Sequence, residues 1–180
     1  VFNFLVSKKF KLIELSDNQS FKIDYDFNIK IQRVDFYDSA LIVKIGDKKI
    51  FNLNDCPIHS KNDLLRFKNL YGNCDFLVTQ FSYAAWKGGK ENIEWRANAA
   101  REKLVKMEKQ ANALKCKKII PFASFVYFSN QENKYLNDKM NTPKDLDIFF
   151  RDKDQQIIFM KPLEQQVLDN LFPTKESFNF

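Results

Sequence analysis

The chain has 180 residues, with 29 Lys and Arg, 23 Asp and Glu, one His and a formal net charge of +6. That length suits one domain, or part of a larger one. Plentiful Phe, Leu, Ile and Val, with little Gly and Pro, exclude disorder over most of the chain. No apolar run approaches the roughly 20 residues of a membrane helix, so we expect a globular, cytoplasmic protein without a membrane partner.

The single His and the few Cys residues limit the metal chemistry of this chain. A Rieske cluster needs two His and a His-rich zinc site about three, whereas only His59 is present, and we expect it in a surface loop. Cys56, Cys74 and Cys116 are far apart and form no CxxC pair, which predicts reduced thiols and no zinc knuckle. The modest positive charge predicts a solvated Lys-rich face, and we do not expect a nucleic-acid partner.

The first third of the chain is predicted to form strands. Alternating or continuous apolar patterns indicate strands at 10–15, 20–25, 29–34, 40–45 and 48–53. Gly46 and Asp47 supply a tight turn between the last two, which therefore form a hairpin. The nearly continuous apolar run of 40–45 predicts a strand that is buried on both faces.

Asp55 directly follows the second strand of this hairpin, and Pro57 then stops the ladder. A carboxylate at the end of a strand, just before a loop, is where sheet-based enzymes place ligands and catalytic groups. The alternative interpretation is that Asp55 only caps the following turn. The pattern alone leaves both open.

The rest of the chain alternates helices with strands. Further strands are predicted at 75–80, 118–128 and 157–160. Helices are predicted at 63–70 with its C-cap at Tyr71-Gly72-Asn73, at 93–114, around Tyr135 and Leu136, from Pro143 with Thr142 as N-cap, and at 163–171. We expect a loosely held tail at 172–180.

The longest predicted helix, 93–114, carries one apolar stripe with its basic residues, Arg96 among them, off the stripe. Strands followed by alternating helices and strands predict an α/β (α+β layered) fold over residues 1–180. The many apolar strands want partners on both faces, and the chain starts at Val1 and not at Met. We therefore expect this single domain to be the C-terminal part of a larger one.

The segment 38–56 resembles the later motif of metallo-β-lactamase-fold hydrolases, in which the second strand of a hairpin ends in a metal-bridging Asp. The similarity is closest to the metallo-β-lactamase-like part of the CMP-N-acetylneuraminate hydroxylase family, monooxygenases that also carry a Rieske domain. It continues through 81–84, the helix that contains Trp95, 121–125 and 133–142, and covers about 38–150. The resemblance implies half of a metallo-β-lactamase-like αββα sandwich.

The resemblance also implies roles for particular residues. Asp55 matches the bridging carboxylate, which can bind one oxygen to each of two metals. Asn130 stands where the family has a metal-ligand His, and its carbonyl oxygen is a weaker ligand. Asp35 lies near the place of another ligand His. The candidate substrate-pocket residues are Asn54, Tyr83 and Trp86.

The HxHxDH motif of the family lies upstream in the fold and has no match here. The resemblance therefore implies a missing N-terminal half as partner, with zinc or iron bound by the full domain and none by this chain alone. The implied chemistry is metal-dependent hydrolysis of an ester, lactone, phosphodiester or amide, or hydroxylation of a nucleotide sugar with an electron-transfer partner. The alternative is a degenerate, non-catalytic binding or scaffold protein of the same fold, which Asn130 favours. Charge alone supports a third hypothesis, a nucleic-acid-binding module.

Overall fold

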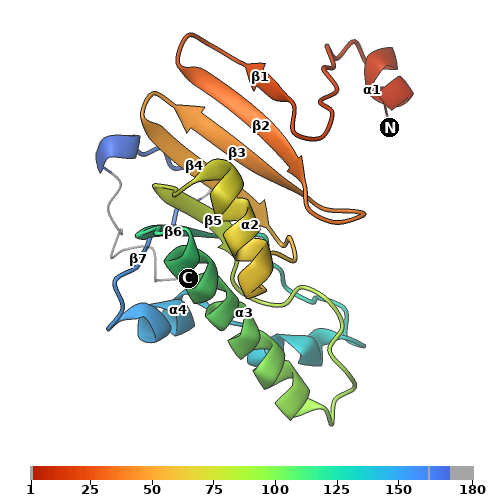
Figure 1. The fold of residues 1–180 in the computed structure, drawn as a ribbon. Helices are drawn as coiled ribbons and strands as arrows, with labels where there is room; N and C mark the ends of the chain where they lie inside the picture. Colours follow the sequence, from red (N-terminus) through yellow and green to blue (C-terminus); the bar gives the residue numbers. More distant parts are fainter. Residues whose placement is uncertain (1, 162, 171–180) are drawn as a thin grey trace.

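The computed structural model describes residues 2–161 and 163–170, and within them one mixed seven-stranded sheet runs in the order of the chain (Figure 1). Strands β1 to β4 pair antiparallel, and β4 to β7 pair parallel. The strands are β1 Ser20–Lys22, β2 Phe27–Arg33, β3 Ser39–Ile45, β4 Lys48–Asn54, β5 Phe76–Gln80, β6 Lys118–Phe122 and β7 Gln156–Ile157. The predicted mixed α/β class is confirmed.

Helices α2, α3 and α4 contribute to the main core on one face of this sheet. Their caps follow the predicted chemistry: Gly72 ends α2 with a φ of 79°, and Thr142 forms a capping box with Asp145 at the start of α4. The helices are α1 Phe2–Ser7, α2 Lys61–Tyr71, α3 Ile93–Ala113 and α4 Pro143–Phe150, with the 3-10 helices η1 Lys134–Lys139 and η2 Leu168–Asn170. Within the described ranges, no helix has the length and apolar character needed to cross a bilayer.

The second face of the sheet is covered differently. The register places one set of apolar side chains on it, and each is half-buried: Ile29, Ile31, Leu41, Val43, Ile50 and Val78. Its small buried cluster centres on Phe76 and Ile158, and Leu168 of η2 packs against it. The prediction that β3 is buried on both faces is therefore wrong. Ala40 and Ile42 are buried in the core to which α2, α3 and α4 contribute, whereas Leu41 and Val43, on the second face, are only half-buried.

Several predicted elements are shorter than expected or absent. Residues 10–15 form no strand, since Phe10 and Ile13 are exposed and pair with no neighbour strand. Strand β6 ends at Phe122, where Ala123 turns into a left-handed conformation (φ 58°), well before the predicted residue 128. The predicted helix at 163–171 is absent up to Leu168, and Leu163 is 99% exposed. Strand β7 is two residues long, and the predicted tail 172–180 lies outside the described residues.

The apolar stripe of α3 is confirmed from Ala100 onward but is wrong in its first turns. Ile93 and Ala97 are exposed, and Arg96, predicted to lie off the stripe, is 1% exposed. Its guanidinium donates to both carboxylate oxygens of Asp138 at 2.7 and 2.8 Å and to the carbonyls of Gly89 (2.6 Å) and Lys90 (3.0 Å). A guanidinium can be buried when its donors are paired in this way, so Arg96 joins α3 to η1 and to the loop before α3.

Replacing Arg96 is expected to be costly. Arg96→Met should lower the free energy of unfolding by about 1–3 kcal/mol, because the partly exposed Asp138 carboxylate and two carbonyls lose their donors. Urea unfolding followed by circular dichroism measures this. Arg101→Met, an exposed change on the same helix, is the matched control and should have little effect. Equal unfolding midpoints for the two variants would contradict the role given to Arg96.

Candidate functional site

The carboxyl ends of β4, β5 and β6 meet at one edge of the sheet, because these strands are parallel. The register aligns Asn54 with Thr79 and Thr79 with Pro121, so Asp55 and Gln80 follow at the same level. Ligand sites of parallel sheets lie at such edges. This edge is therefore the candidate site.

The chain turns sharply after β4. A bulge lies between Asn52 and Asn54, and Asn54 adopts a left-handed conformation (φ 48°) while its amide donates to the Asn52 side chain at 3.0 Å. The turn buries Cys56 and exposes Asp55. Among the described residues, nothing donates a hydrogen bond to the Asp55 carboxylate, so Asp55 is not the cap of this turn.

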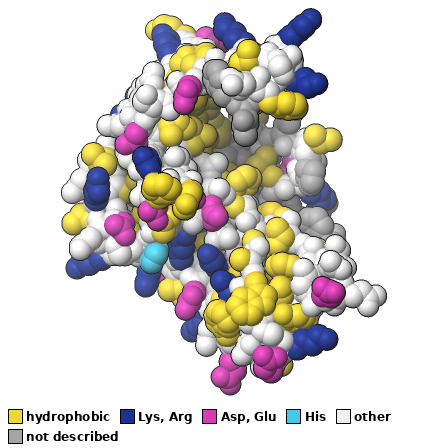
Figure 2. Space-filling model, turned by 90° about the vertical axis from the view of Figure 1, so that its right-hand side faces the viewer, with side chains coloured by type: hydrophobic (Ala, Val, Ile, Leu, Met, Phe, Trp, Pro, Cys, Tyr) yellow, Lys and Arg dark blue, Asp and Glu magenta, His cyan; other side chains and the backbone are white. Residues whose placement is uncertain are grey.

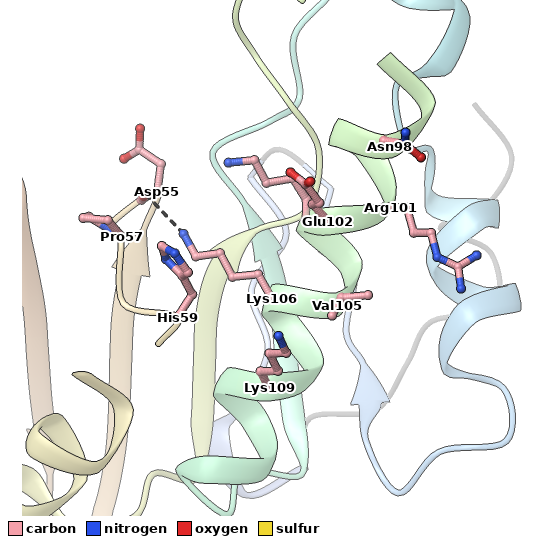
Figure 3. Close-up of a pocket in the computed structure, with 10 residues that line it drawn as sticks. Asp55, Pro57, His59, Asn98, Arg101, Glu102, Val105, Lys106 and Lys109 are labelled. Carbon is pink, nitrogen blue, oxygen red and sulfur yellow. Dashed lines mark hydrogen bonds between the residues drawn. The ribbon is translucent and has the colours of Figure 1, made fainter. Parts of the chain in front are cut away.

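Two lysine side chains of α3 reach the carboxyl ends of β4 and β5. The ammonium of Lys106 donates to the main-chain carbonyls of Cys56 (2.6 Å) and Asp55 (3.3 Å), as Figure 3 shows for Asp55. One turn earlier, Lys103 donates to Oε1 of the buried Gln80 at 2.5 Å. The two Lys106 bonds hold the turn by its backbone, and no described residue donates a hydrogen bond to the Asp55 carboxylate.

The surroundings disfavour the charge on both lysines. Burial, and after it the neighbouring positive charge of Lys103, lower the pKa of Lys106 to about 8, against the opposing effect of Cys56 and Asp55. Burial also lowers the pKa of Lys103, with a contribution from Lys87. A lysine ammonium is therefore held here at an electrostatic cost.

A cavity of about 710 Å³, which we call the Lys106 cleft, lies between α3 and the loop after β4. Figure 3 shows Lys106 pointing across it toward Asp55 and His59, whereas Arg101 points away. Figure 2 shows Lys and Arg side chains gathered beside the single His. The lining is Asp55, Pro57, His59, Asn98, Arg101, Glu102, Lys103, Val105, Lys106 and Lys109, so basic side chains outnumber acidic ones.

A buried amide supports the cleft from below. Gln110 of α3, fully buried, accepts a hydrogen bond from the Thr79 hydroxyl and donates to the carbonyl of Ile58, both at 2.8 Å. Gln110 thus joins α3 both to β5 and to the loop after β4, one of the two segments that line the cleft. Sequence reasoning missed Gln110, Lys103 and Lys106; the one available signal was a Gln at a position that continues the apolar stripe of α3.

The remaining predicted site residues lie in different places. Asp35, in the turn after β2, lines a separate cavity of about 300 Å³ together with Arg66, and its carboxylate accepts from the amide of Phe36. Asn130 is exposed in the loop before η1, where its carbonyl accepts from the amide of Asn133. Of the candidates, Asp55 and its neighbour Asn54 stand at the carboxyl edge of β4.

Tyr83 and Trp86 belong to the loop after β5. Tyr83 is buried between α3 and η1, with its hydroxyl donating to the carbonyl of Leu136 at 2.5 Å. Trp86 is exposed and packs edge-to-face on Trp95 of α3. Within residues 2–161 and 163–170, no three His, Cys, Asp or Glu side chains come together in a group that could hold a metal ion.

Comparison with known proteins shows similarity at the level of fold. No family model and no curated protein matches the chain. Among solved structures, it is similar to the diiron β-hydroxylase CmlA from Streptomyces venezuelae, at 10% identity and a TM-score of 0.53 over 82% of this chain and 33% of that one. A mutant of the CmlA β-hydroxylase is similar at 11% identity and a TM-score of 0.55, over 83% of this chain and 32% of that one. This chain thus spans about a third of the CmlA chains.

The metallo-β-lactamase fold protein YhfI from Bacillus subtilis is a further match, at 11% identity and a TM-score of 0.47 over 88% of this chain and 59% of that one. At these identities the likeness to CmlA concerns the fold alone.

Lys106 should titrate with a midpoint of about 8 in a ¹³C NMR pH series of lysine side chains. Because its pKa lies below the ordinary value, the unfolded chain binds more protons between about pH 8 and the ordinary lysine pKa. The free energy of unfolding should therefore rise with pH across that window. Lys106→Gln protein is the control and should lack the signal; a lysine signal near pH 8 that survives this change would refute the assignment.

Proposed function

We propose that this chain is the C-terminal half of a metallo-β-lactamase-like domain, and that Asp55 is its metal-bridging carboxylate. The observation that carries the proposal is the placement of Asp55 at the carboxyl edge of β4. Its carboxylate is exposed and accepts no hydrogen bond among the described residues, while Lys106 holds its main chain. A carboxylate whose main chain is fixed, and whose oxygens accept no hydrogen bond from a described residue, has its oxygens available to a metal ion.

The incomplete burial of the second face of the sheet supports the proposal that the domain has an N-terminal half. Its six half-buried apolar side chains lie where a second sheet of an αββα sandwich would pack. The proposed partner is accordingly an N-terminal half that brings both a covering sheet and the His ligands. Zinc and iron are the metals in question; CmlA, which shares the fold, is a diiron protein.

The residues of this chain do not by themselves fit a metal. Asp55 is one carboxylate, and the described residues contain no group of three suitable ligands. We therefore assign no reaction step to this chain alone. For the complete domain we propose metal-dependent hydrolysis, or a hydroxylation similar to that of the CMP-N-acetylneuraminate hydroxylase family, on a small molecule or nucleotide sugar.

Metal analysis of the protein expressed from its complete gene tests this proposal. Asp55→Asn should lower metal affinity at least as much as loss of an outer-shell group, which costs about 10–100-fold. Inductively coupled plasma mass spectrometry on purified protein reports the metal content. Asp152→Asn, an exposed carboxylate after α4, is the matched control and should keep the metal. Full metal content in the Asp55→Asn protein, or none in the wild type, would overturn the role of Asp55.

A second candidate function is binding without chemistry, by a degenerate domain of the same fold. The basic lining of the Lys106 cleft favours it, and the resemblance, which implies that Asn130 replaces a family His, agrees with it. An anionic small molecule is the ligand that such a lining would take, because like charges confined in a cleft raise the local concentration of the opposite ion.

Titration with inorganic pyrophosphate, in the presence of a chelator, tests this second candidate by NMR shift changes. Lys109→Gln should weaken binding, and higher salt should weaken it further, because the charges in the cleft are then screened. Lys144→Gln, on the exposed side of α4, is the control. NMR shift changes that are the same in the Lys109→Gln protein, or that persist at high salt, would rule out the cleft as an anion site.

A further inference from the structure

Cys74 and Cys116 stand at matching positions before two neighbouring strands. Strands β5 and β6 are parallel, and their register pairs Phe76 with Lys118. Each cysteine precedes its member of that pair by two residues, so both lie at the same level at the amino ends of the strands. The amide of Cys74 donates to the carbonyl of Leu114 at 3.2 Å, which keeps the two segments adjacent beyond the ladder.

The two thiols face each other in the core. Both side chains are buried in the main apolar cluster, and the Cys116 thiol also contacts the carbonyl of Asp75, the neighbour of Cys74, at 3.4 Å. Hydrogen bonding between the two thiols raises the pKa of Cys74 and lowers that of Cys116, so attack by the accessible Cys74 is slow and the disulfide is reached on long equilibration. Adjacent strands lie about 4.7–4.9 Å apart, and a disulfide needs Cα atoms about 4.4–6.8 Å apart. The spacing of the two strands that these cysteines precede is therefore within the range that a disulfide bridges.

Cys74 also lines a cavity that is open to solvent. This cavity of about 360 Å³ reaches Cys74 from the surface, and four lysines line it against two aspartates: Lys48, Lys115, Lys117 and Lys118. The excess of positive charge favours approach of an anionic reagent over a neutral one. Cys74 is 6% exposed and Cys116 1%, so Cys74 is the thiol that such a reagent meets first.

We propose that Cys74 and Cys116 form a reversible intramolecular disulfide on reaction with an anionic low-molecular-weight disulfide such as glutathione disulfide. The Cys74 sulfur gives up its proton and attacks the reagent, whose S–S bond breaks; one small thiol leaves with that proton. The Cys116 sulfur then attacks the mixed disulfide on Cys74, and the second small thiol leaves with the Cys116 proton. Two protein thiols are oxidised, and one small disulfide is reduced to two thiols.

Cys56 provides an internal control. It is 1% exposed, and burial raises its pKa to about 11, so it resembles the pair in burial. Its Sγ has no thiol partner, since the pair lies at the opposite ends of the strands, before β5 and β6, whereas Cys56 follows β4. If burial alone set the reactivity, all three cysteines would react with the oxidant to a similar extent. In the proposed reaction of the pair, Cys56 stays reduced.

The test equilibrates the folded chain with graded ratios of reduced and oxidised glutathione, then quenches with acid and alkylates the remaining thiols. Intact mass and peptide mapping should show loss of two hydrogens and a Cys74–Cys116 cross-link, with Cys56 alkylated. Cys56→Ser protein should close in the same way. Cys116→Ser should stop at a glutathione adduct on Cys74, and Cys74→Ser should form neither product.

Two results would overturn the proposal. One is a fully reduced chain at oxidising ratios that do cross-link the same chain in urea. The other is a bond that includes Cys56. Because reducing agent should restore the starting mass, a cross-link that resists reduction would also count against it. Circular dichroism of each variant checks that it is folded, and thermal unfolding should show a higher midpoint for the cross-linked chain.

Discussion

The buried amide of Gln110 is the contact on which the arrangement of the candidate site depends. It joins α3 to β5 through Thr79 and to the loop after β4 through the carbonyl of Ile58. An amide with several hydrogen-bonding atoms can be buried only where partners meet it, so these bonds specify one register of the helix on the sheet. With that register set, Lys103 and Lys106 come to lie over the strand ends.

Helix α3 carries charged lysine side chains along the border of its apolar stripe. Leu104, Met107 and Ala111 of α3 supply the packing, and the lysines interleaved with them reach polar atoms at the rim of the sheet. Their long stems allow this, because the methylene groups can cover apolar surface while the ammonium meets a carbonyl. The same helix therefore supports the fold along one stripe and shapes the cleft along its border.

Local patterns predicted the parts of the fold that local chemistry decides. The hairpin of β3 and β4, the glycine cap of α2 and the capping box at Thr142 all follow from neighbouring residues. Burial of Arg96 does not, because its partners Asp138 and Gly89 are brought to it by other segments.

The site shows the same division. Asp55 was predictable from its position after a hairpin strand, whereas the bonds of Lys106 and the meeting of Cys74 with Cys116 depend on contacts about 40 to 50 residues apart in the chain. The wrong strand at 10–15 and the wrong helix from 163 have one origin: an apolar pattern indicates an element only when another surface is present to receive it.

The order of the strands in the sheet has a consequence for how the chain assembles. Because every strand pairs with the one before it in the chain, no later strand has to insert between two that are already joined. As the polypeptide leaves the ribosome, the sheet can grow at a single edge, first by local hairpins and then by crossovers that each carry a helix. The last strand among the described residues, β7, offers two residues as a template. So short an edge gives a strand from another molecule little to pair with.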